Sequence, residues 1–492
     1  MEFAAELAAS LKEFSASGLV EVRENGGRPA PFEGLSWEIR GTLEKPLLHI
    51  WSDGFNLTRR VLAITDFSEQ RLALAVECFG RAKPDRLEFL RKDFQRQARD
   101  VSRQEFCDRL KSILAEQFPD EALDSLVTSE DLEHSLPGNY ARGSLHRGSA
   151  HTAILAAGAG ESPDTIAKSL TFALLWLHRL QSSRGIRGSI GGLRIIVPAG
   201  SARSLAHCCG ALSSSLRAQL FELDPRLEVL QEVGIAHEGN IDSWLVPVRD
   251  FQALLDRARN EIAPIVAIAP RAISLHPAQA RSVVLRFRGL PFALWEDGNV
   301  FQWSGDARHP ISGDPGKTLA AHLRDLELHR NPLATDTRHQ FYRAQPERWL
   351  ESLVREDVTR IDAILDPRFV YSQVFAHAGG EHGILDLLCV TRFGRLCILE
   401  LKANEHIHLP LQAADYWLRI RRHLQRGDFQ RYGYFPGITL QQAPPLVYLV
   451  APALRFHPST EIILRFLSPE IEFVRVGLVE SWRRGLRVVS RQ

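Results

Sequence analysis

The chain has 492 residues, of which 45% are hydrophobic and 24% are charged, a composition typical of a folded protein with several domains. Its 60 basic and 59 acidic residues give a net charge of +1, which excludes a strongly basic, chromatin-type protein. No apolar run is long enough to span a membrane, the start lacks the pattern of a signal peptide, and the six cysteines form no C-x-x-C pair. We therefore expect a cytoplasmic protein with no membrane partner and no zinc ribbon.

The first part of the chain, residues 1–135, predicts a β-rich module with attached helices. Helical stretches are expected over 3–14 and 84–117. The strand-like runs lie near residues 35–39, 46–51, 60–64 and 72–76. The residues of this module do not identify its role. We expect residues 1–340 to supply targeting, a partner surface or regulation, and the N-terminal domains are the candidates for binding a protein partner or forming a homodimer.

The following part, residues 136–265, predicts an α/β middle domain. Residues 136–165 are rich in Gly, Ser, Ala and Pro, which is typical of a linker or an exposed loop. Beyond them we expect, in order, a helix over 165–181, a strand over 193–197, a helix over 201–216 and a strand over 219–223. Residues 266–340 predict a connector rich in β-hairpins, with one turn at Asp297-Gly298-Asn299.

The last part, residues 341–492, predicts an α-β-β-β-α-β order with an α-β extension. Helices are expected near 346–358, 410–426 and 458–467, and strands near 369–375, 383–390, 396–401, 446–451 and 471–476. The whole chain is thus expected to be an α/β multidomain protein.

A three-residue hairpin loop is predicted within residues 391–395, where Gly394 can take the positive φ that such a loop needs. Counting outward from the centre of the loop pairs Cys389 with Cys397. We expect both cysteines to be buried, reduced thiols.

The same counting places Asp386 opposite Glu400, with Lys402 on the same face of the sheet. Facing carboxylates in an apolar hairpin repel each other, and a divalent cation between them would turn the repulsion into attraction. Carboxylate oxygens suit Mg²⁺ or Mn²⁺, and a lysine beside the metal can stabilise charge on a phosphate. We also expect desolvation to lower the pKa of Lys402.

The spacing of three motifs resembles the PD-(D/E)xK nuclease superfamily, in its RecB-like and NucS-like branches. The motifs are G-x-x-D at 383–386, E-x-K at 400–402 and Q-x-x-x-Y at 412–416. The resemblance covers about residues 340–480 and implies a restriction-endonuclease-like core with a mixed sheet. No proline precedes Asp386, which is a departure from the name-giving motif.

The resemblance implies metal-binding roles for Asp386 and Glu400, a further metal ligand in the backbone carbonyl of Leu401, and a catalytic role for Lys402. The implied cofactor is Mg²⁺ or Mn²⁺, and the implied activity is hydrolysis of nucleic-acid phosphodiester bonds, with DNA as the expected substrate and RNA left open.

The resemblance also implies that Gln412 and Tyr416, four residues apart on one helix, help to hold the lysine and the DNA backbone. The family often adds an acid from its first helix. Glu347 and Glu351 both stand in that helix, and Glu351 is the preferred candidate, although the sequence leaves both open.

Arginines follow Tyr416 along the same helix and beyond it, and basic residues near aromatic ones suit a phosphate backbone. We expect these nucleic-acid contacts: Arg419, Arg422, Arg426 and Arg431.

The main hypothesis is a metal-dependent deoxyribonuclease in DNA repair or phage defence. One alternative is a non-catalytic nucleic-acid-binding or scaffold protein on a nuclease-like fold. Another is a defence effector gated by a ligand of the middle domain. The sequence decides neither the strandedness of the substrate nor the pathway.

Overall fold

A computed structural model describes residues 2–15, 20–24, 30–31, 36–42, 45–52, 55–68, 71–77, 85–183, 189–224, 226–235, 243–279, 281–304, 307–372, 374–376 and 385–492. The chain divides into two compact units, Met1–Leu110 and Lys111–Gln492, which are treated separately below. Within the described ranges no helix has both the length and the apolar character needed to cross a bilayer.

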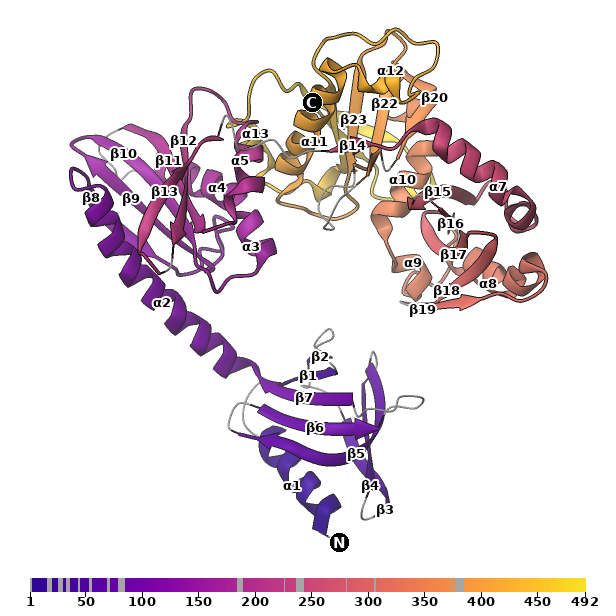
Figure 1. The fold of residues 1–492 in the computed structure, drawn as a ribbon, viewed down its shortest axis with the longest axis horizontal. Helices are drawn as coiled ribbons and strands as arrows, with labels where there is room; N and C mark the ends of the chain where they lie inside the picture. Colours follow the sequence, from indigo (N-terminus) through magenta and orange to yellow (C-terminus); the bar gives the residue numbers. More distant parts are fainter. Residues whose placement is uncertain are drawn as a thin grey trace. The chain divides into compact units, whose positions relative to one another are not determined.

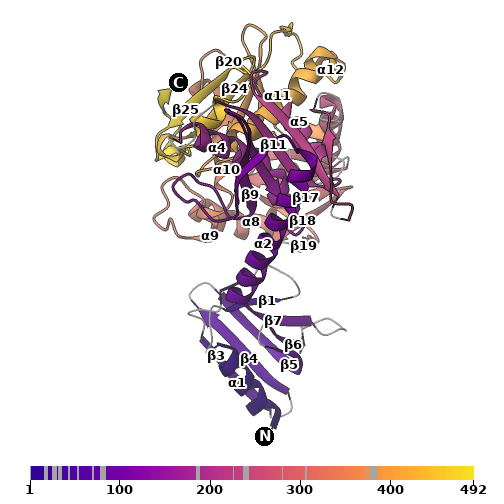
Figure 2. The ribbon, with the colours of Figure 1, turned by 90° about the vertical axis from the view of Figure 1, so that its left-hand side faces the viewer.

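The N-terminal unit contains a seven-stranded antiparallel sheet in the order β2-β1-β7-β6-β5-β4-β3. Its elements are α1 (Glu2–Ser15), β1 (Val20–Glu24), β2 (Ala30–Pro31), β3 (Ser36–Thr42), β4 (Lys45–Ser52), β5 (Phe55–Phe67), β6 (Arg71–Glu77), β7 (Asp85–Arg91) and α2 (Lys92–Gln117), which continues into the second unit. Leu7, Leu11 and Phe14 lie three to four residues apart on α1 and pack with core residues of the strands. Helix α1 lies beside the sheet (Figure 2).

The predicted β-rich character of this unit is confirmed, with one correction. Residues 85–91, which were expected to begin a long helix, form strand β7. Leu87 and Phe89 are buried and alternate with less buried neighbours, which is the period-two pattern of a strand rather than of a helix.

The second unit begins with a mixed six-stranded sheet in the order β13-β12-β11-β10-β9-β8. Its elements are β8 (Ala122–Val127), β9 (Tyr140–Arg147), β10 (Ala150–Ala157), α3 (Pro163–Ala167), α4 (Ser169–Gln181), β11 (Ser189–Pro198), α5 (Ala202–Cys209), β12 (Arg217–Asp224) and β13 (Val229–Val233). The three strands β10, β11 and β12 are parallel, as the predicted β-α-β order requires.

The predicted loop at 136–165 is wrong, because most of it forms the hairpin of β9 and β10. The small residues permit close packing between strands. A Cβ atom on Gly143 would lie 2.1 Å from the carbonyl oxygen of Ser125 on β8. The helix expected over 201–216 is also shorter than predicted, since α5 ends at Cys209.

Residues 273–310 form a five-stranded antiparallel sheet whose neighbouring strands follow each other in the sequence (Figure 1). Two helices, one before and one after these strands, contribute residues to its core. The elements are α7 (Val248–Val266), β15 (Ile273–Gln279), β16 (Ser282–Phe287), β17 (Leu290–Glu296), β18 (Asn299–Ser304), β19 (Ala307–Pro310), α8 (Pro315–His329) and α9 (Gln340–Arg343). Asp297 and Gly298 both have positive φ and form the predicted turn between β17 and β18.

The C-terminal sheet is mixed and has the order β20-β22-β23-β24-β25-β26. Its elements are α10 (Pro346–Glu356), β20 (Leu365–Tyr371), β22 (Leu387–Thr391), β23 (Leu396–Leu401), α11 (Leu409–Gln425), α12 (Asp428–Arg431), β24 (Leu446–Pro452), α13 (Thr460–Leu464), β25 (Phe473–Leu478) and β26 (Val488–Arg491). Three short 3₁₀ turns lie at Val358–Arg360, Ala453–Arg455 and Trp482–Arg484, and the short strands β14 (Trp244–Leu245) and β21 (Phe375–Ala376) pair with each other.

Alternate residues of β22 and β23 face two different cores. Leu387 and Leu399 pack with residues of α10, whereas Leu388 and Ile398 pack with residues of α11. The second of these cores also contains Leu155 and its neighbours from the middle sheet, so the two mixed sheets of this unit share one apolar interior. Residues 383 and 384, which were expected to begin the second strand, lie outside the described residues.

Candidate active site

The hairpin of β22 and β23 has the predicted register. Cys389 lies opposite Cys397, and both are buried free thiols. The N–H of Thr391 donates to the carbonyl of Arg395 at 2.8 Å, which closes the three-residue loop. Gly394 has φ of 90°, as the loop requires. The hairpin therefore fixes which residues meet at its open end.

Asp386, Glu400 and Lys402 meet at that open end. Asp386 directly precedes β22, and its Oδ2 accepts a hydrogen bond of 2.9 Å from the backbone N–H of Leu401. Nζ of Lys402 donates to Oε1 of Glu400 at 3.0 Å. The Glu400 side chain has no exposed surface, whereas Lys402 and Asp386 each keep 14% of theirs exposed. The spatial convergence expected from the sequence is thus present, and the chemical roles of the three residues stay predictions.

Burial and mutual repulsion oppose ionisation of both acids. Burial raises the pKa of Asp386, the neighbouring Glu351 raises it further, and Lys402 only partly offsets both. Burial likewise raises the pKa of Glu400, and the charge of Asp386 adds to that rise. Without a cation this site therefore holds carboxylates that resist carrying their full negative charge.

The expectation for Lys402 is corrected by the same contacts. Burial alone would lower the pKa of Lys402, but the charges of Glu400 and Asp386 outweigh it, and the net shift is upward. In this structure the side chain is therefore a firmly charged ammonium donor and not a group poised to accept a proton.

Helix α10 supplies the two candidate acids of the first helix. Glu351 is buried, and its Oε2 accepts a hydrogen bond of 2.6 Å from Arg348. Its negative charge raises the pKa of Asp386. Glu347 is partly exposed and accepts a weak bond of 3.5 Å from the side-chain amide of Asn404. Both acids act electrostatically on the site, Glu351 on Asp386 and Glu347 on Lys402, and of the two only Glu351 is buried.

Arg348 was not anticipated from the sequence. Its NH1 lies 2.6 Å from Oε2 of Glu351 and 3.8 Å from Oδ1 of Asp386. The spacing of three residues between Arg348 and Glu351 on one helix was the available signal, since such pairs are neighbours on a helix surface. Nothing local in the sequence indicated the contact with Asp386.

Gln412 and Tyr416 lie on one face of α11, as their spacing predicted. Nε2 of Gln412 donates to the hydroxyl of Tyr416 at 3.3 Å. Burial raises the pKa of the Tyr416 phenol well above its usual value, and the charge of Glu400 raises it further. The phenol therefore stays protonated and lies within electrostatic reach of the carboxylates.

The residues present are chemically suited to hold a divalent cation. Oε1 of Glu351 and Oε2 of Glu400 are both buried without a hydrogen-bond partner, and buried carboxylate oxygens normally have one. A hard cation is a partner that such carboxylate oxygens accept, and its charge would offset the repulsion. In the described part of the chain no three Asp, Glu, His or Cys side chains form a preassembled metal cluster. The role of the Leu401 carbonyl stays a prediction, since the contact seen here involves its N–H.

The predicted basic surface needs one correction. Arg419 is buried, and its guanidinium donates to both carboxylate oxygens of Asp415, at 2.9 and 3.0 Å. It belongs to an internal ion pair and is not available to a nucleic acid. Arg426 and Arg431 are exposed, and Arg422 is partly exposed, so these three remain candidates.

Helix α4 contacts the loop that follows Lys402. Nδ1 of His408 lies 2.7 Å from Oγ1 of Thr171 on α4, and the His408 ring meets Phe172 edge to face. Burial is the main cause that lowers the pKa of both His406 and His408 to about 4. Both histidines are therefore neutral at physiological pH, and His408 attaches the loop to α4.

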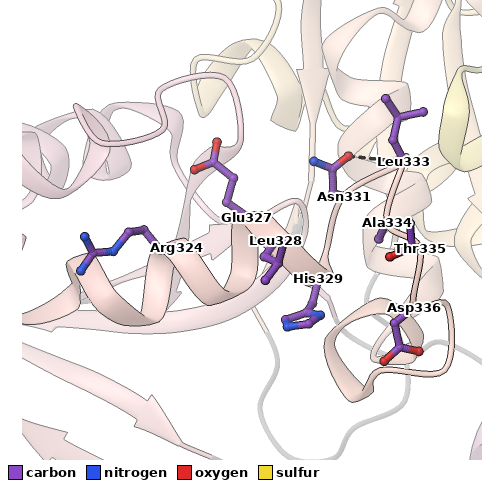
Figure 3. A pocket seen from close by; sticks show the side chains of 9 residues that line it. All are labelled: Arg324, Glu327, Leu328, His329, Asn331, Leu333, Ala334, Thr335 and Asp336. Carbon is purple, nitrogen blue, oxygen red and sulfur yellow. Dashed lines mark hydrogen bonds between the residues drawn. The ribbon is translucent and has the colours of Figure 1, made fainter.

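A separate hollow of about 560 Å³ lies at the end of α8 (Figure 3). In it, Oδ1 of Asn331 accepts a bond of 2.9 Å from the N–H of Leu333. The lining residues are Arg324, Glu327, Leu328, His329, Asn331, Leu333, Ala334, Thr335 and Asp336. None of them belongs to the carboxylate site.

Comparisons with known proteins add little to this geometry. No protein-family model and no curated protein matches the chain. Among solved structures, a repair endonuclease from Pyrococcus abyssi is matched at 12% identity with a TM-score of 0.13, covering 48% of this chain and 97% of that one. At this TM-score the similarity carries no argument about this protein.

Proposed function

We propose that the C-terminal part of this chain is a metal-dependent endonuclease that hydrolyses phosphodiester bonds, with DNA as the substrate and Mg²⁺ or Mn²⁺ as the cofactor. The observation that carries the proposal is the meeting of Asp386, Glu400 and Lys402 in one buried site at the open end of a hairpin.

Paired buried acids beside a lysine are otherwise unfavourable. The charges of Lys402 and Arg348 both act on Asp386 and on Glu400, so the site is not a simple salt bridge of one carboxylate with one ammonium. The oxygens of Glu351 and Glu400 that lack partners show that the site is not balanced by hydrogen bonds alone. Such a cost is typical of a site retained for chemistry.

Asp386, Glu400 and Glu351 would hold the cation through their carboxylates, and the carbonyl of Leu401 is a further candidate ligand. A bound divalent cation supplies an activated water and neutralises charge that develops on the phosphorane. Lys402, kept charged by its acidic neighbours, donates hydrogen bonds toward the phosphate oxygens and the attacking water.

Gln412 and Tyr416 would hold the substrate backbone or the lysine from α11. The exposed side chains of Arg426 and Arg431, together with Arg422, would hold phosphates further from the cut. A place in DNA repair or in phage defence, in the cytoplasm, fits this activity.

The test is a cleavage panel with the full chain. Plasmid, linear, branched and single-stranded DNA, and RNA, are incubated with Mg²⁺, Mn²⁺ or a chelator. We expect cutting only with metal, and a loss of at least about 100-fold in rate for Asp386→Asn and for Lys402→Met. Lys317→Met is the matched control, because its side chain is 87% exposed and lies outside the site.

Wild-type rates in the Asp386 and Lys402 variants would exclude this site as the nuclease centre. A protein that binds nucleic acid, holds no Mn²⁺ and cuts nothing under any metal would instead support the scaffold alternative. Cutting that appears only when a nucleotide is added would support the ligand-gated alternative.

A further inference from the structure

Arg348 occupies an unusual place between two of the carboxylates. Its NH1 contacts Oε2 of Glu351 at 2.6 Å and approaches Oδ1 of Asp386 to 3.8 Å. The side chain is 22% exposed, so it is not fully enclosed by the protein. A guanidinium can form several hydrogen bonds in one plane, to carboxylates or to a phosphate.

The backbone of Arg348 is fixed by a second contact. Gly289, in the turn between β16 and β17, has φ of 82°, and a Cβ atom there would lie 2.0 Å from the carbonyl oxygen of Arg348. The five-stranded sheet therefore packs directly on α10 at this residue. A fixed backbone leaves the long side chain as the part that can change partners.

Cations outnumber carboxylates around Glu351. The negative charge of Glu351 acts to raise the pKa of Arg286 on β16 and of Arg355 on α10, in addition to that of Arg348. With Lys402 bound to Glu400, four cationic side chains interact electrostatically with one or more of the acids Glu351, Asp386 and Glu400. A divalent cation that enters such a site is repelled unless one side-chain cation withdraws or an anion arrives.

Building on the proposed function, we propose that Arg348 is an exchangeable counter-cation. In the absence of metal it neutralises Glu351 and Asp386, and when a divalent cation takes these carboxylates it turns to a phosphate oxygen of the substrate. Metal and phosphodiester would then bind cooperatively, and each would raise the affinity for the other by the same factor. Arg348 would thereby limit occupation of the site by metal alone.

The experiment measures Mn²⁺ binding to the full chain by electron paramagnetic resonance, with and without dimethyl phosphate as the smallest phosphodiester. We expect wild-type protein to bind Mn²⁺ more tightly when dimethyl phosphate is present. Arg348→Gln should bind Mn²⁺ alone about tenfold more tightly than wild type, because a nearby positive charge is gone, and should respond little to dimethyl phosphate.

Two further variants make the result decisive. Arg348→Lys keeps the charge and should retain weak Mn²⁺ binding together with part of the coupling, which also guards against a folding defect in the glutamine variant. Arg343→Gln removes an exposed arginine at the end of α9 and should match wild type. Thermal unfolding in chelator should show a loss of stability in Arg348→Gln that Mn²⁺ reverses.

The outcomes separate this inference from the proposed function. If Asp386→Asn abolishes Mn²⁺ binding while Arg348→Gln binds Mn²⁺ as wild type does, the counter-cation role is wrong and the nuclease centre stands. If wild-type protein binds no Mn²⁺ at all, both proposals fail.

Discussion

Glu400 and Lys402 stand two residues apart where β23 ends, and their side chains join at 3.0 Å in a buried setting. The pairing follows from strand geometry, since alternate residues share a face. Asp386 lies beside them at the start of β22, because the loop length sets the register of the hairpin and places Asp386 next to the end of β23. Four predictions extend this relationship to the elements that support the site.

Tyr416→Phe should reduce cleavage about tenfold to 100-fold while Mn²⁺ affinity stays the same. The change removes the hydroxyl that accepts the bond from Gln412 but leaves the ring in its buried place. Single-turnover rates and Mn²⁺ titrations of the same preparations check this. Tyr432→Phe, at the partly exposed residue that directly follows α12, serves as the control. A parallel loss of metal binding would mean that Tyr416 acts on the carboxylates instead.

Gly394→Ala should destabilise the protein by roughly 2–4 kcal/mol. A Cβ atom at this position would lie 2.2 Å from the carbonyl oxygen of Thr439, in addition to the strain at φ of 90°. Gly437→Ala is the matched control, with φ of 80° and no atom within 4 Å, and should lose only about 1 kcal/mol. Urea unfolding of both variants measures the difference, and equal losses would show that only φ matters.

Asp415→Asn should lower stability in a pH-dependent manner. Burial would raise the pKa of Asp415, but His207, 3.1 Å away, and Arg419 outweigh it and hold the pKa below its usual value. An acid whose pKa is lowered on folding stabilises the fold above its unfolded pKa, and this stabilisation disappears as the pH falls through the folded value.

We therefore expect the variant to be less stable than wild type by about 2–4 kcal/mol near neutral pH, because it leaves Arg419 buried without its carboxylate. The gap should shrink below about pH 4. Urea midpoints of both proteins over that range measure the gap, and a constant difference would argue for a purely steric effect of the substitution.

Arg426→Gln combined with Arg431→Gln should weaken DNA binding and lower the slope of log affinity against log salt by about two, if these two exposed arginines make the proposed phosphate contacts. Arg419→Gln should instead lower the unfolding midpoint with little change in that slope, because its charge is held by Asp415. Fluorescence anisotropy at several salt concentrations distinguishes the two. An unchanged slope in the double variant would place the DNA elsewhere.

Most helices and strands could be predicted from spacing alone, but the hairpin of β9 and β10 could not. The hairpin of β9 and β10 was taken for a loop because small residues such as Gly143 are frequent in turns. In the folded protein the position of Gly143 requires a residue without a side chain, because β8 passes close to it. Composition cannot distinguish these two uses of glycine, since the second depends on a strand from elsewhere in the chain.

The sequence by itself determined the relations that lie within one element or one hairpin. Loop length and the period of two bring Asp386, Glu400 and Lys402 together, and the helical period aligns Gln412 with Tyr416. Only the tertiary structure decided the rest. Arg348 reaches Asp386, Arg419 is buried, and the pKa of Lys402 is raised above its usual value. Burial and charge balance are sums over side chains from distant segments, and packing alone brings those segments into contact.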